Sequence, residues 1–308
     1  MARNPFRFGT DLWDPTHRFE TSWLLSPWLL FFCRALLVSQ SWEYEFQLFK
    51  TLDKVVSDSR AFNAHLAQCL YAFTTLIFVL AWQCVHSEHG CSASRDTFSY
   101  FTHLSYWGLA FYLLVASVHT FTYARSGAAL LDRFPRWLQA LHSLFYTTVV
   151  VFPFIVTVVF WAVLYSGGWF PEVFAGWSNM SQHALNSVFA FVEIVVPRTD
   201  VPPAIHMLWL ILLLALYLAL AYVTEATKGF YTYSFLDPAD QGSLVAAYVF
   251  GIAVGCLIVF GLAWGAIWLR KFITERKLGK QGKFATPAGE AVAAKDLEMS
   301  KSKEPSVA

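Results

Sequence analysis

Three polar side chains interrupt an apolar segment in the second half of the sequence. His183, Asn186 and Glu193 lie within residues 181–197, where most other side chains are apolar. In a helix that turns about 100° per residue, Asn186 falls about 60° and Glu193 about 80° around the axis from His183, so the three share one face. Ionisable groups within a membrane helix are costly and usually face the protein interior or a water-filled cavity, so these residues are candidates for a functional site.

A threonine near the start of another apolar segment could act with this histidine. On the topology derived below, Thr102 lies at the same membrane depth as His183. A threonine hydroxyl becomes a nucleophile when a base takes its proton, and histidine is the commonest base. Asn186, Glu193 or Glu225 could orient or buffer the imidazole. Lipid esters are the natural substrates for such a pair near a membrane surface, although the same polar residues could instead only bond helix to helix.

The histidines also admit a second chemistry. His103 and His183 fall at one membrane level, and His119, His142 and His206 fall at the other. Two layers of histidine could bind two haems, as in transmembrane electron carriers. We favour the alternative that the second group lies at the membrane interface without a ligand. The five cysteines show no metal-ligand spacing, so we expect no metal and no cofactor.

The composition indicates an integral membrane protein. Of 308 residues, 56% are hydrophobic and 14% are charged, whereas about a quarter are charged in soluble proteins. A net charge of +1 gives no reason to expect nucleic acid as a partner; we expect membrane lipids instead. Segments of 17 or more largely apolar residues, about the length that crosses a bilayer, occupy 100–123, 141–165, 181–197, 205–226 and 244–269.

The distribution of Lys and Arg orients these segments, because basic loops favour the cytosol. Six basic residues lie in 270–283 and three lie in 124–138, whereas 166–180 has none. The basic N-terminal region is then also cytosolic, which requires one more crossing before residue 86. We therefore predict an all-α fold of six transmembrane helices in a bundle, with cytosolic N and C termini.

The domain boundaries follow from this count. Residues 1–25 are predicted to be a polar cytosolic N-terminus that lacks the apolar core of a cleavable signal peptide. Residues 26–272 form the transmembrane domain. Residues 273–308 have few large apolar side chains and are predicted to be a disordered cytosolic tail.

The crossing before residue 86 is divided by a polar segment, residues 38–68. Joining its flanks directly would give one uninterrupted apolar span. The segment begins Val-Ser and ends in Gln, as an intron with a GTGAGT donor and a CAG acceptor would encode. We hypothesise a translated, retained intron, and a cytosolic or re-entrant loop is the alternative.

Two smaller patterns concern packing. Cys84 and Cys91 flank a short loop on the predicted lumenal side, where a disulfide is plausible. Glycine pairs in the last span have the small-xxx-small spacing that lets a neighbouring helix approach closely. The pairs are Gly251/Gly255 and Gly261/Gly265.

Most of the chain resembles a known family. Over about residues 69–270 it is similar to the androgen-induced-protein-like (FAR-17a type) membrane family, particularly its fungal members. The resemblance is carried, in order, by YFTHLSYWGLAFYLL, LHSLFYTTVVVFPFIVTVVFWAVLY, WSNMSQHALNSVFAFVEIVVPRT and LAYVTEATKGFYTYSFLD. HALNS before an acidic position also resembles the animal Rolling stone-like proteins.

The resemblance implies an activity and its residues. Characterised members are threonine hydrolases that cleave fatty acid esters of hydroxy fatty acids. Their nucleophile follows a Phe/Tyr-x-Thr pattern, which matches Thr102. Their histidine follows a Trp-x-Asn-x-x-x-His pattern and precedes a glutamate by ten positions, which matches His183 and Glu193. The resemblance therefore implies a lipid-ester hydrolase with Thr102 as nucleophile and His183 as base.

The resemblance also leaves an alternative. The animal hydrolases usually have a second histidine where this sequence has Met180, which bears on the substrate. Rolling stone-like relatives are associated with cell fusion, so a non-enzymatic membrane organiser is the competing function. Either protein would reside in the endoplasmic reticulum, as part of the endomembrane system, or in the plasma membrane.

Overall fold

The computed structural model describes residues 18–25, 27, 30, 63–126 and 128–280. These residues are helical or in turns, apart from one isolated bridge between Ser22 and Pro197. The predicted all-α fold is confirmed for the described residues. The α-helices are α3 (Asn63–His86), α4 (Cys91–Asp96), α5 (Phe101–Ser126), α6 (Arg136–Val149), α7 (Phe152–Val159), α8 (Val173–Met180), α9 (Asn186–Val195), α10 (His206–Lys228), α11 (Pro238–Gln241) and α12 (Leu244–Lys271).

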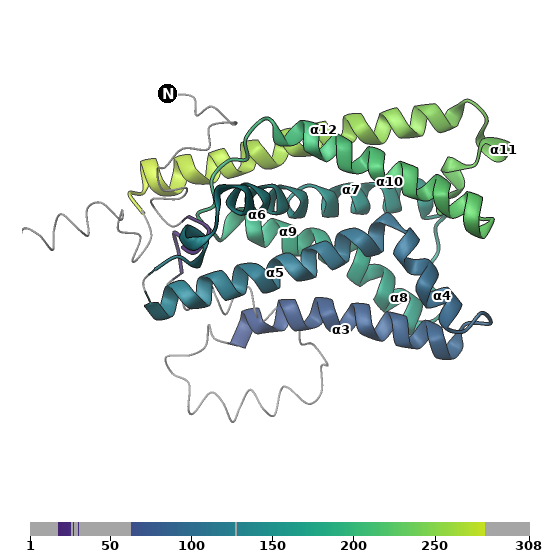
Figure 1. The fold of residues 1–308 in the computed structure, drawn as a ribbon, viewed down its shortest axis with the longest axis horizontal. Coiled ribbons are helices and arrows are strands. Elements are labelled where there is room, and N and C mark those ends of the chain that lie inside the picture. The colour runs from purple at the N-terminus through teal and green to yellow at the C-terminus, as the bar shows by residue number, and fades with distance from the viewer. Residues whose placement is uncertain (1–17, 26, 28–29, 31–62, 127, 281–308) are drawn as a thin grey trace, which may run out of the picture.

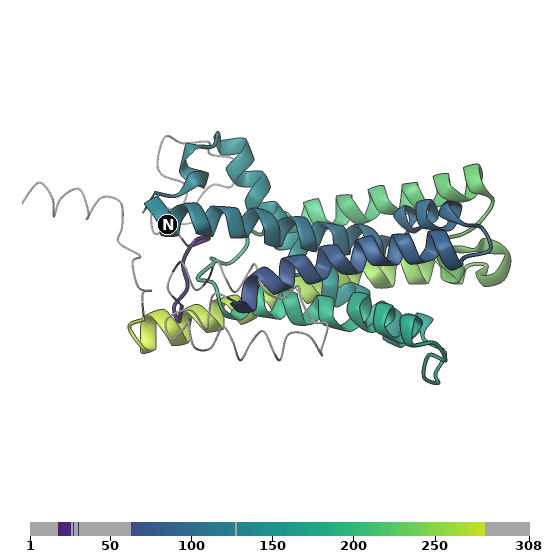
Figure 2. The ribbon, with the colours of Figure 1, turned by 90° about the horizontal axis from the view of Figure 1, so that it is seen from below.

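The long helices run roughly along one axis and form an elongated bundle (Figures 1 and 2). Shorter helical turns join or extend them. The turns at Phe160–Leu164, Ser181–Leu185 and Phe272–Lys277 are π-helical, and those at Thr97–Ser99, Leu130–Arg133 and Ser234–Leu236 are 3₁₀-helical.

Four helices are long and apolar enough to cross a membrane, judged by length and composition over the described residues. They correspond to four of the five expected spans. Their apolar side chains also point outwards: Leu216 is 58% exposed and Leu262 is 68% exposed. Such side chains suit a lipid environment rather than water. The four helices are Phe101–Tyr123, Arg136–Leu164, His206–Lys228 and Leu244–Lys277.

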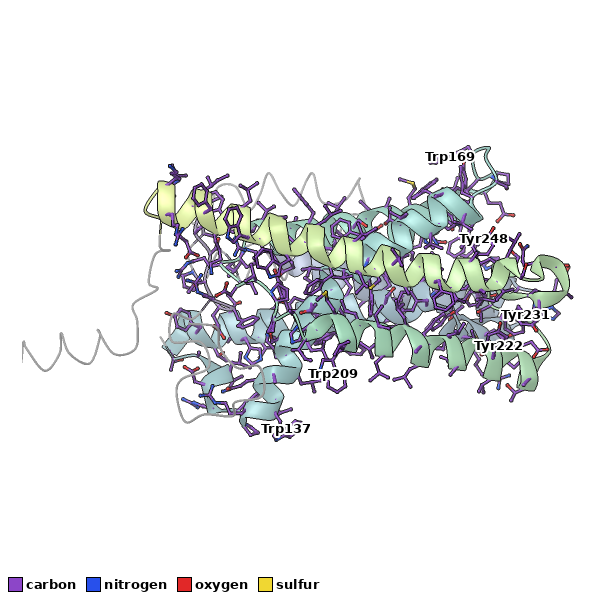
Figure 3. The ribbon with its side chains drawn as sticks, turned by 90° about the horizontal axis from the view of Figure 1, so that it is seen from above. Trp137, Trp169, Trp209, Tyr222, Tyr231 and Tyr248 are labelled. Carbon is purple, nitrogen blue, oxygen red and sulfur yellow. A yellow bond between two sulfur atoms is a disulfide. The ribbon has the colours of Figure 1, made fainter. Side chains whose placement is uncertain are left out.

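Aromatic side chains lie toward both ends of this bundle (Figure 3). Trp and Tyr commonly occupy the two membrane–water interfaces, because their rings are apolar and their tips are polar. Trp137 is 61% exposed and Trp169 is 72% exposed, so both are placed to meet such an interface. Figure 3 shows one group of Trp169, Tyr222, Tyr231 and Tyr248 and, toward the opposite end, a second group of Trp137 and Trp209.

Two further helical segments lie along the bundle. The apolar part of α3 is shorter, Tyr71–His86. A continuous helix runs through α8, the π-helical turn Ser181–Leu185 and α9. The helix that contains the span expected at 181–197 starts earlier, at Val173, because the residues before Ser181 continue the same helix. The count of six spans and the cytosolic termini stay predictions.

A break in the second long helix is held by polar side chains from α9. Pro153 follows the end of α6 and lacks the N–H that would continue the helical hydrogen bonds. Its carbonyl accepts hydrogen bonds from Asn186 Nδ2 (3.3 Å) and Ser187 Oγ (3.0 Å). Thr157 Oγ1 donates to Asn186 Oδ1 (3.1 Å). Asn186 therefore joins α9 to α7.

One packing expectation is confirmed, and another is not met among the described residues. Cys84 and Cys91 form a disulfide that joins the end of α3 to the start of α4. The glycine pairs of α12 do not admit a neighbouring helix within the described chain, because a Cβ at any of the four would meet no atom within 4 Å. Instead α12 packs through a different stripe, whose buried residues include Cys256, Phe260, Ala263 and Ile267.

The domain boundaries expected from the sequence stay predictions. The helix after α12 continues to Lys277, past the boundary expected at 272, and Glu275 there pairs with Arg18 (2.8 Å). Residues 38–62 of the hypothesised insert lie outside the described residues, and the remainder belongs to α3, which begins at Asn63. Sequencing the transcript still tests the intron hypothesis. The segments 1–17 and 281–308 also lie outside the described residues.

Candidate functional site

Thr102 lies in the first turn of α5 and is 8% exposed. The first N–H groups of a helix have no partner within the helix and carry the positive end of its dipole. One of them, the N–H of Thr102, donates to Tyr233 Oη (3.4 Å). The Tyr233 hydroxyl also interacts with the Thr102 side chain. The start of α5 and the Tyr233 hydroxyl therefore both lie beside Thr102, and both can stabilise negative charge.

His183 lies in the π-helical turn between α8 and α9 and is 9% exposed. Its imidazole stacks face to face on the ring of Phe160, with 3.6 Å between ring centroids and 6° between ring planes. Phe160 begins a second π-helical turn, Phe160–Leu164. Such turns are rare in helices and are often found at functional sites.

Two side-chain hydrogen bonds hold the backbone next to the imidazole. The N–H of Ser187 donates to Asn186 Oδ1 (2.7 Å), and the His183 carbonyl accepts from Trp161 Nε1 (2.9 Å). Asn186 and Trp161 therefore bond to the backbone at and just after the π-helical turn that carries His183.

Thr102 and His183 line the same cavity, which has a volume of about 630 Å³. We call it the polar cavity. No hydrogen bond joins the two side chains in the described structure. Catalytic hydrogen bonds often form or shorten only when substrate binds, so the two residues can still act as nucleophile and base. Other polar residues that line the cavity include Gln83, Tyr100, His103, Asn179, Gln182 and Tyr233.

Several buried polar atoms of this lining lack a protein partner. Among the described residues, His183 Nδ1, Gln182 Oε1 and Gln83 Oε1 are buried and accept or donate no hydrogen bond. Leaving such an atom unpaired costs about 1–3 kcal/mol. All three side chains line the polar cavity, so its wall carries unused hydrogen-bonding capacity, which favours a site for a polar group.

The other candidate residues lie elsewhere. Glu193 is 1% exposed, and its carbonyl accepts from Tyr146 Oη (3.3 Å). It lies ten residues beyond His183, about 15 Å along the helix, and does not line the polar cavity. Glu225 lies near the end of α10 beside Tyr231 and also does not line it. Of the five site residues predicted from the sequence, Thr102 and His183 line the polar cavity, and Asn186, Glu193 and Glu225 do not.

Three contributors escaped the sequence reasoning: Phe160, Trp161 and Tyr233. Tyr233 follows α10 in a Tyr-rich turn, on the side predicted to be lumenal, so its location was a usable signal. Burial raises the pKa of Tyr233 above its usual range, and its phenol therefore stays protonated and able to donate. The stacking of Phe160 had no signal in the sequence, because it depends on how two helices are rotated.

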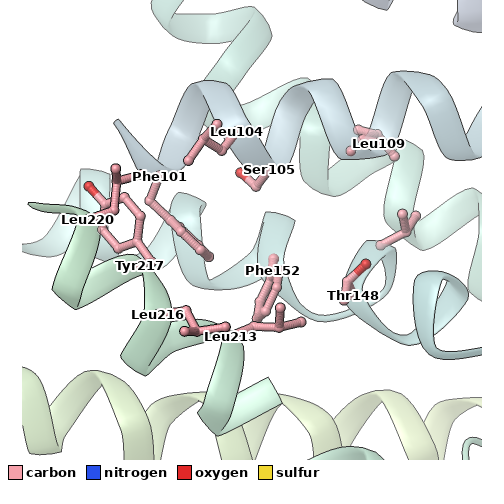
Figure 4. A pocket seen from close by; sticks show the side chains of 12 residues that line it. Phe101, Leu104, Ser105, Leu109, Thr148, Phe152, Leu213, Leu216, Tyr217 and Leu220 are labelled. Carbon is pink, nitrogen blue, oxygen red and sulfur yellow. The ribbon is translucent and has the colours of Figure 1, made fainter. Parts of the chain in front are cut away.

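A separate groove lies on the outer face of the bundle between α5 and α10 (Figure 4). It has a volume of about 320 Å³ and a mainly apolar lining. Its serine and threonine hydroxyls are bonded within their own helices: Ser105 Oγ donates to the Thr102 carbonyl (3.0 Å) and Thr148 Oγ1 to the Phe145 carbonyl (2.7 Å). Neither Thr102 nor His183 lines this groove.

The three histidines predicted at the other membrane level, His119, His142 and His206, pack against or bond to protein side chains. His119 and His142 pack edge to face with 5.1 Å between ring centroids, which leaves no room for a macrocycle between them. His206 Nδ1 is hydrogen-bonded to Thr147 Oγ1 (2.6 Å). Within the described ranges, no group of three His, Cys, Asp or Glu residues is placed to hold a metal ion.

An all-helical bundle with outward-facing apolar side chains and a buried polar cavity defines an integral membrane protein. The family model of the FAR-17a/AIG1-like proteins matches residues 64–266, and the chain belongs to this family. The match includes Thr102 and His183, and it confirms the family expected from the sequence. No match to a curated protein or to a solved structure was found.

Proposed function

We propose that this protein is a lipid-ester hydrolase in which Thr102 is the nucleophile and His183 is the base. The observation that carries the proposal is that both side chains, which come from different helices and are more than 90% buried, line one polar cavity. A buried hydroxyl and a buried imidazole facing one cavity in a membrane bundle suit an ester substrate with a long apolar part.

The reaction would proceed through an acyl-threonine. His183 takes the proton of Thr102 Oγ1, directly or through a water molecule, while that oxygen attacks the ester carbonyl carbon. The bond to the alcohol oxygen then breaks, and His183 donates the proton to the leaving alcohol. A water molecule in the polar cavity next hydrolyses the acyl-threonine, again with His183 as base.

The oxyanion of this reaction would form beside donors that are already in place. The first turn of α5 offers main-chain N–H groups and the positive end of the helix dipole. Tyr233 accepts the N–H of Thr102 and also interacts with its side chain, so the phenol lies beside the place where the oxyanion would form. The stack on Phe160 would orient the imidazole, in place of the carboxylate of a Ser-His-Asp triad.

The proposed topology places this site on the lumenal or exterior side. We propose that α3 and the continuous helix through α8 and α9 complete six spans, with both termini in the cytosol. The Cys84–Cys91 disulfide favours an oxidising compartment for the turn between α3 and α4. The polar cavity lies at the same end, since His89 and Asp96 from this region line it. The endomembrane system or the plasma membrane fits this arrangement.

The test is hydrolysis of a panel of fatty acid esters by the full chain purified in nanodiscs. Thr102→Ala and His183→Ala are each expected to lower kcat by about 10²–10⁴-fold, whereas Thr102→Ser keeps part of the activity. Thr227→Ala and His86→Ala are matched controls, because both residues are exposed and lie outside the polar cavity. Their activity should equal that of the wild type.

Two outcomes would contradict the proposal. One is full activity in either alanine variant. The other is a folded wild type without turnover on any ester, combined with lower abundance of both variants. That combination would identify the alternative function, a membrane organiser in which these polar residues only hold helices together.

A further inference from the structure

A second cavity adjoins the polar cavity and has a mainly apolar lining. It has a volume of about 250 Å³ and lies between α7, α10 and α12. We call it the apolar slot. Its walls are almost entirely aliphatic and aromatic, and those on α10 and α12 include Ile211, Leu214, Ala215, Val249, Ile252 and Ala253.

The two cavities meet at the proposed nucleophile. Thr102, Phe160, Leu164 and Tyr233 line both of them, whereas His183 lines the polar cavity alone. A group bonded to Thr102 therefore has a polar space on one side and an apolar space on the other. The outer groove of Figure 4 offers no such junction, because Thr102 does not line it.

We infer that the apolar slot holds the acyl chain of the ester and that the polar cavity holds its alcohol half. This inference rests on the proposed function. The alcohol oxygen must receive a proton from His183 when its bond to the acyl carbon breaks. The alcohol half must therefore point into the polar cavity, and the acyl chain leaves Thr102 on the other side.

The polarity of the two cavities agrees with this orientation. An alkyl chain in the apolar slot replaces water with apolar side chains, which favours binding of each added methylene. Polar side chains that include Gln83, Asn179 and Gln182 line the other space, which suits water or an alcohol half with polar groups. Water for the second step also enters on the side where the alcohol leaves, so the acyl chain does not block it.

The electron and proton balance needs no further reactant. Thr102 Oγ1 gains a bond to the acyl carbon, and that carbon loses its bond to the alcohol oxygen. The threonine proton passes through His183 to the alcohol. Water then adds its oxygen to the acyl carbon, and its proton returns through His183 to Thr102 as the fatty acid leaves the apolar slot.

The experiment uses two series of esters with the wild-type protein. In one series the acyl chain lengthens at a fixed short alcohol, and in the other the alcohol chain lengthens at a fixed short acyl group. We expect kcat/KM to rise about fourfold per methylene of acyl chain until the apolar slot is filled. Lengthening the alcohol should change kcat/KM less than twofold.

Narrowing the apolar slot should shift this preference. Ala253→Leu, from α12, should lower kcat/KM for the longest acyl chain at least tenfold and leave the shortest ester within twofold of wild type. Ala215→Leu narrows the opposite wall on α10 and serves if the first variant does not fold. Ala247→Leu is the matched control, since Ala247 is exposed on α12 outside the apolar slot.

A binding measurement separates this inference from the proposed function. A fatty acid carrying a diazirine should crosslink saturably to α10 and α12, and Ala253→Leu but not Ala247→Leu should reduce the labelling. Such labelling without turnover would support the apolar slot and reject the hydrolase. If Ala253→Leu instead shifts the preference for alcohol length, the apolar slot holds the alcohol half and the proposed orientation of the ester is wrong. Unchanged chain preference and unchanged labelling would overturn the inference.

Discussion

At the scale of single residues, His183 is positioned by an aromatic ring rather than by a carboxylate. Its imidazole stacks on Phe160, and its Nδ1 is buried without a hydrogen-bond partner among the described residues. The acidic residue that the sequence offered for this role, Glu193, lies well away along the helix. The orientation of the imidazole should therefore depend on the shape of the Phe160 side chain.

Replacing Phe160 tests this dependence. Phe160→Leu removes the stack, which is worth about 0.5–1.5 kcal/mol, and should lower kcat about threefold to tenfold at matched folded protein. Phe160→Tyr keeps a flat ring and should restore most of kcat. Phe191→Leu is the control, because Phe191 is 56% exposed on α9. Equal kcat in Phe160→Leu and wild type would show that the ring does not position the imidazole.

Tyr233 carries a second prediction at this scale. Tyr233→Phe removes the hydroxyl beside Thr102 and should lower kcat about 10²-fold, the usual effect of losing one oxyanion donor. Tyr231→Phe removes a hydroxyl two residues away that does not line the polar cavity, and its kcat should be unchanged. Because burial raises the pKa of Tyr233, the phenol stays neutral as pH rises toward 10. An undiminished kcat in Tyr233→Phe would remove this residue from the oxyanion site.

At the scale of helices, α7 and α9 are joined by the hydrogen bonds of Asn186 to Pro153 and Thr157. These bonds act where Pro153 interrupts the helix, so they replace contacts that the proline removes. Asn186 Oδ1 also accepts the Ser187 N–H, directly after the π-helical turn that carries His183. One amide therefore stabilises the junction and shapes the site.

Asn186→Ala should destabilise the protein and reduce activity together. Buried hydrogen bonds between membrane helices contribute about 0.6–1.7 kcal/mol, and a fall in Tm measured in nanodiscs should reflect this loss. Ser187→Ala leaves the Asn186 bond to Pro153 in place and should lower Tm less. If Asn186→Ala keeps both the Tm and the kcat of wild type, the amide has neither role.

At the scale of the whole molecule, charged residues close the end of the bundle opposite the candidate site. Arg270 is 7% exposed and donates to the carbonyls of Ile194 (2.9 Å), Pro197 and Thr199, which caps the end of α9. Arg18 pairs with Glu275 at 2.8 Å. These contacts tie the N-terminal segment, the loop after α9 and the end of α12 into one unit.

Asp200 gives this charged end a dependence on pH. Partial burial opposes its ionisation, but the hydrogen bond and charge of Lys271 and the charge of Arg18 outweigh burial, and the pKa of the carboxyl lies below its usual value. Its stabilising contribution is therefore complete above the unfolded pKa of about 4. It is lost as pH falls through the lower folded pKa.

The expected Tm change is small, because Asp200 is half exposed and such pairs contribute about 0–1 kcal/mol. Tm measured from pH 7 to 3 should fall less below pH 4 in Asp200→Asn than in wild type. Asp240→Asn, at an exposed position of α11, should follow the wild-type curve. Identical curves for wild type and Asp200→Asn would assign the acid sensitivity to other carboxylates.

The hydropathy and charge of the sequence were sufficient to predict an all-helical membrane protein. Runs of about 20 apolar residues have few folds open to them other than helices in a membrane, because each backbone polar group must be bonded internally. The same one-dimensional information placed Thr102 and His183 at one depth, and the motif resemblance selected the same pair. The Cys84–Cys91 disulfide followed from their proximity in the chain and the predicted compartment.

The rotation and local geometry of the helices required three dimensions. A shared helical face suggested that Glu193 could assist His183, but ten residues along a helix is too far for contact. The glycine pairs of α12 matched a packing motif, yet the described neighbours of that helix pack against another stripe. Three features depend on how side chains from distant segments meet: the stack of His183 on Phe160, the position of Tyr233, and the junction of the polar cavity with the apolar slot. The periodicity of one segment does not encode the angles at which those side chains meet.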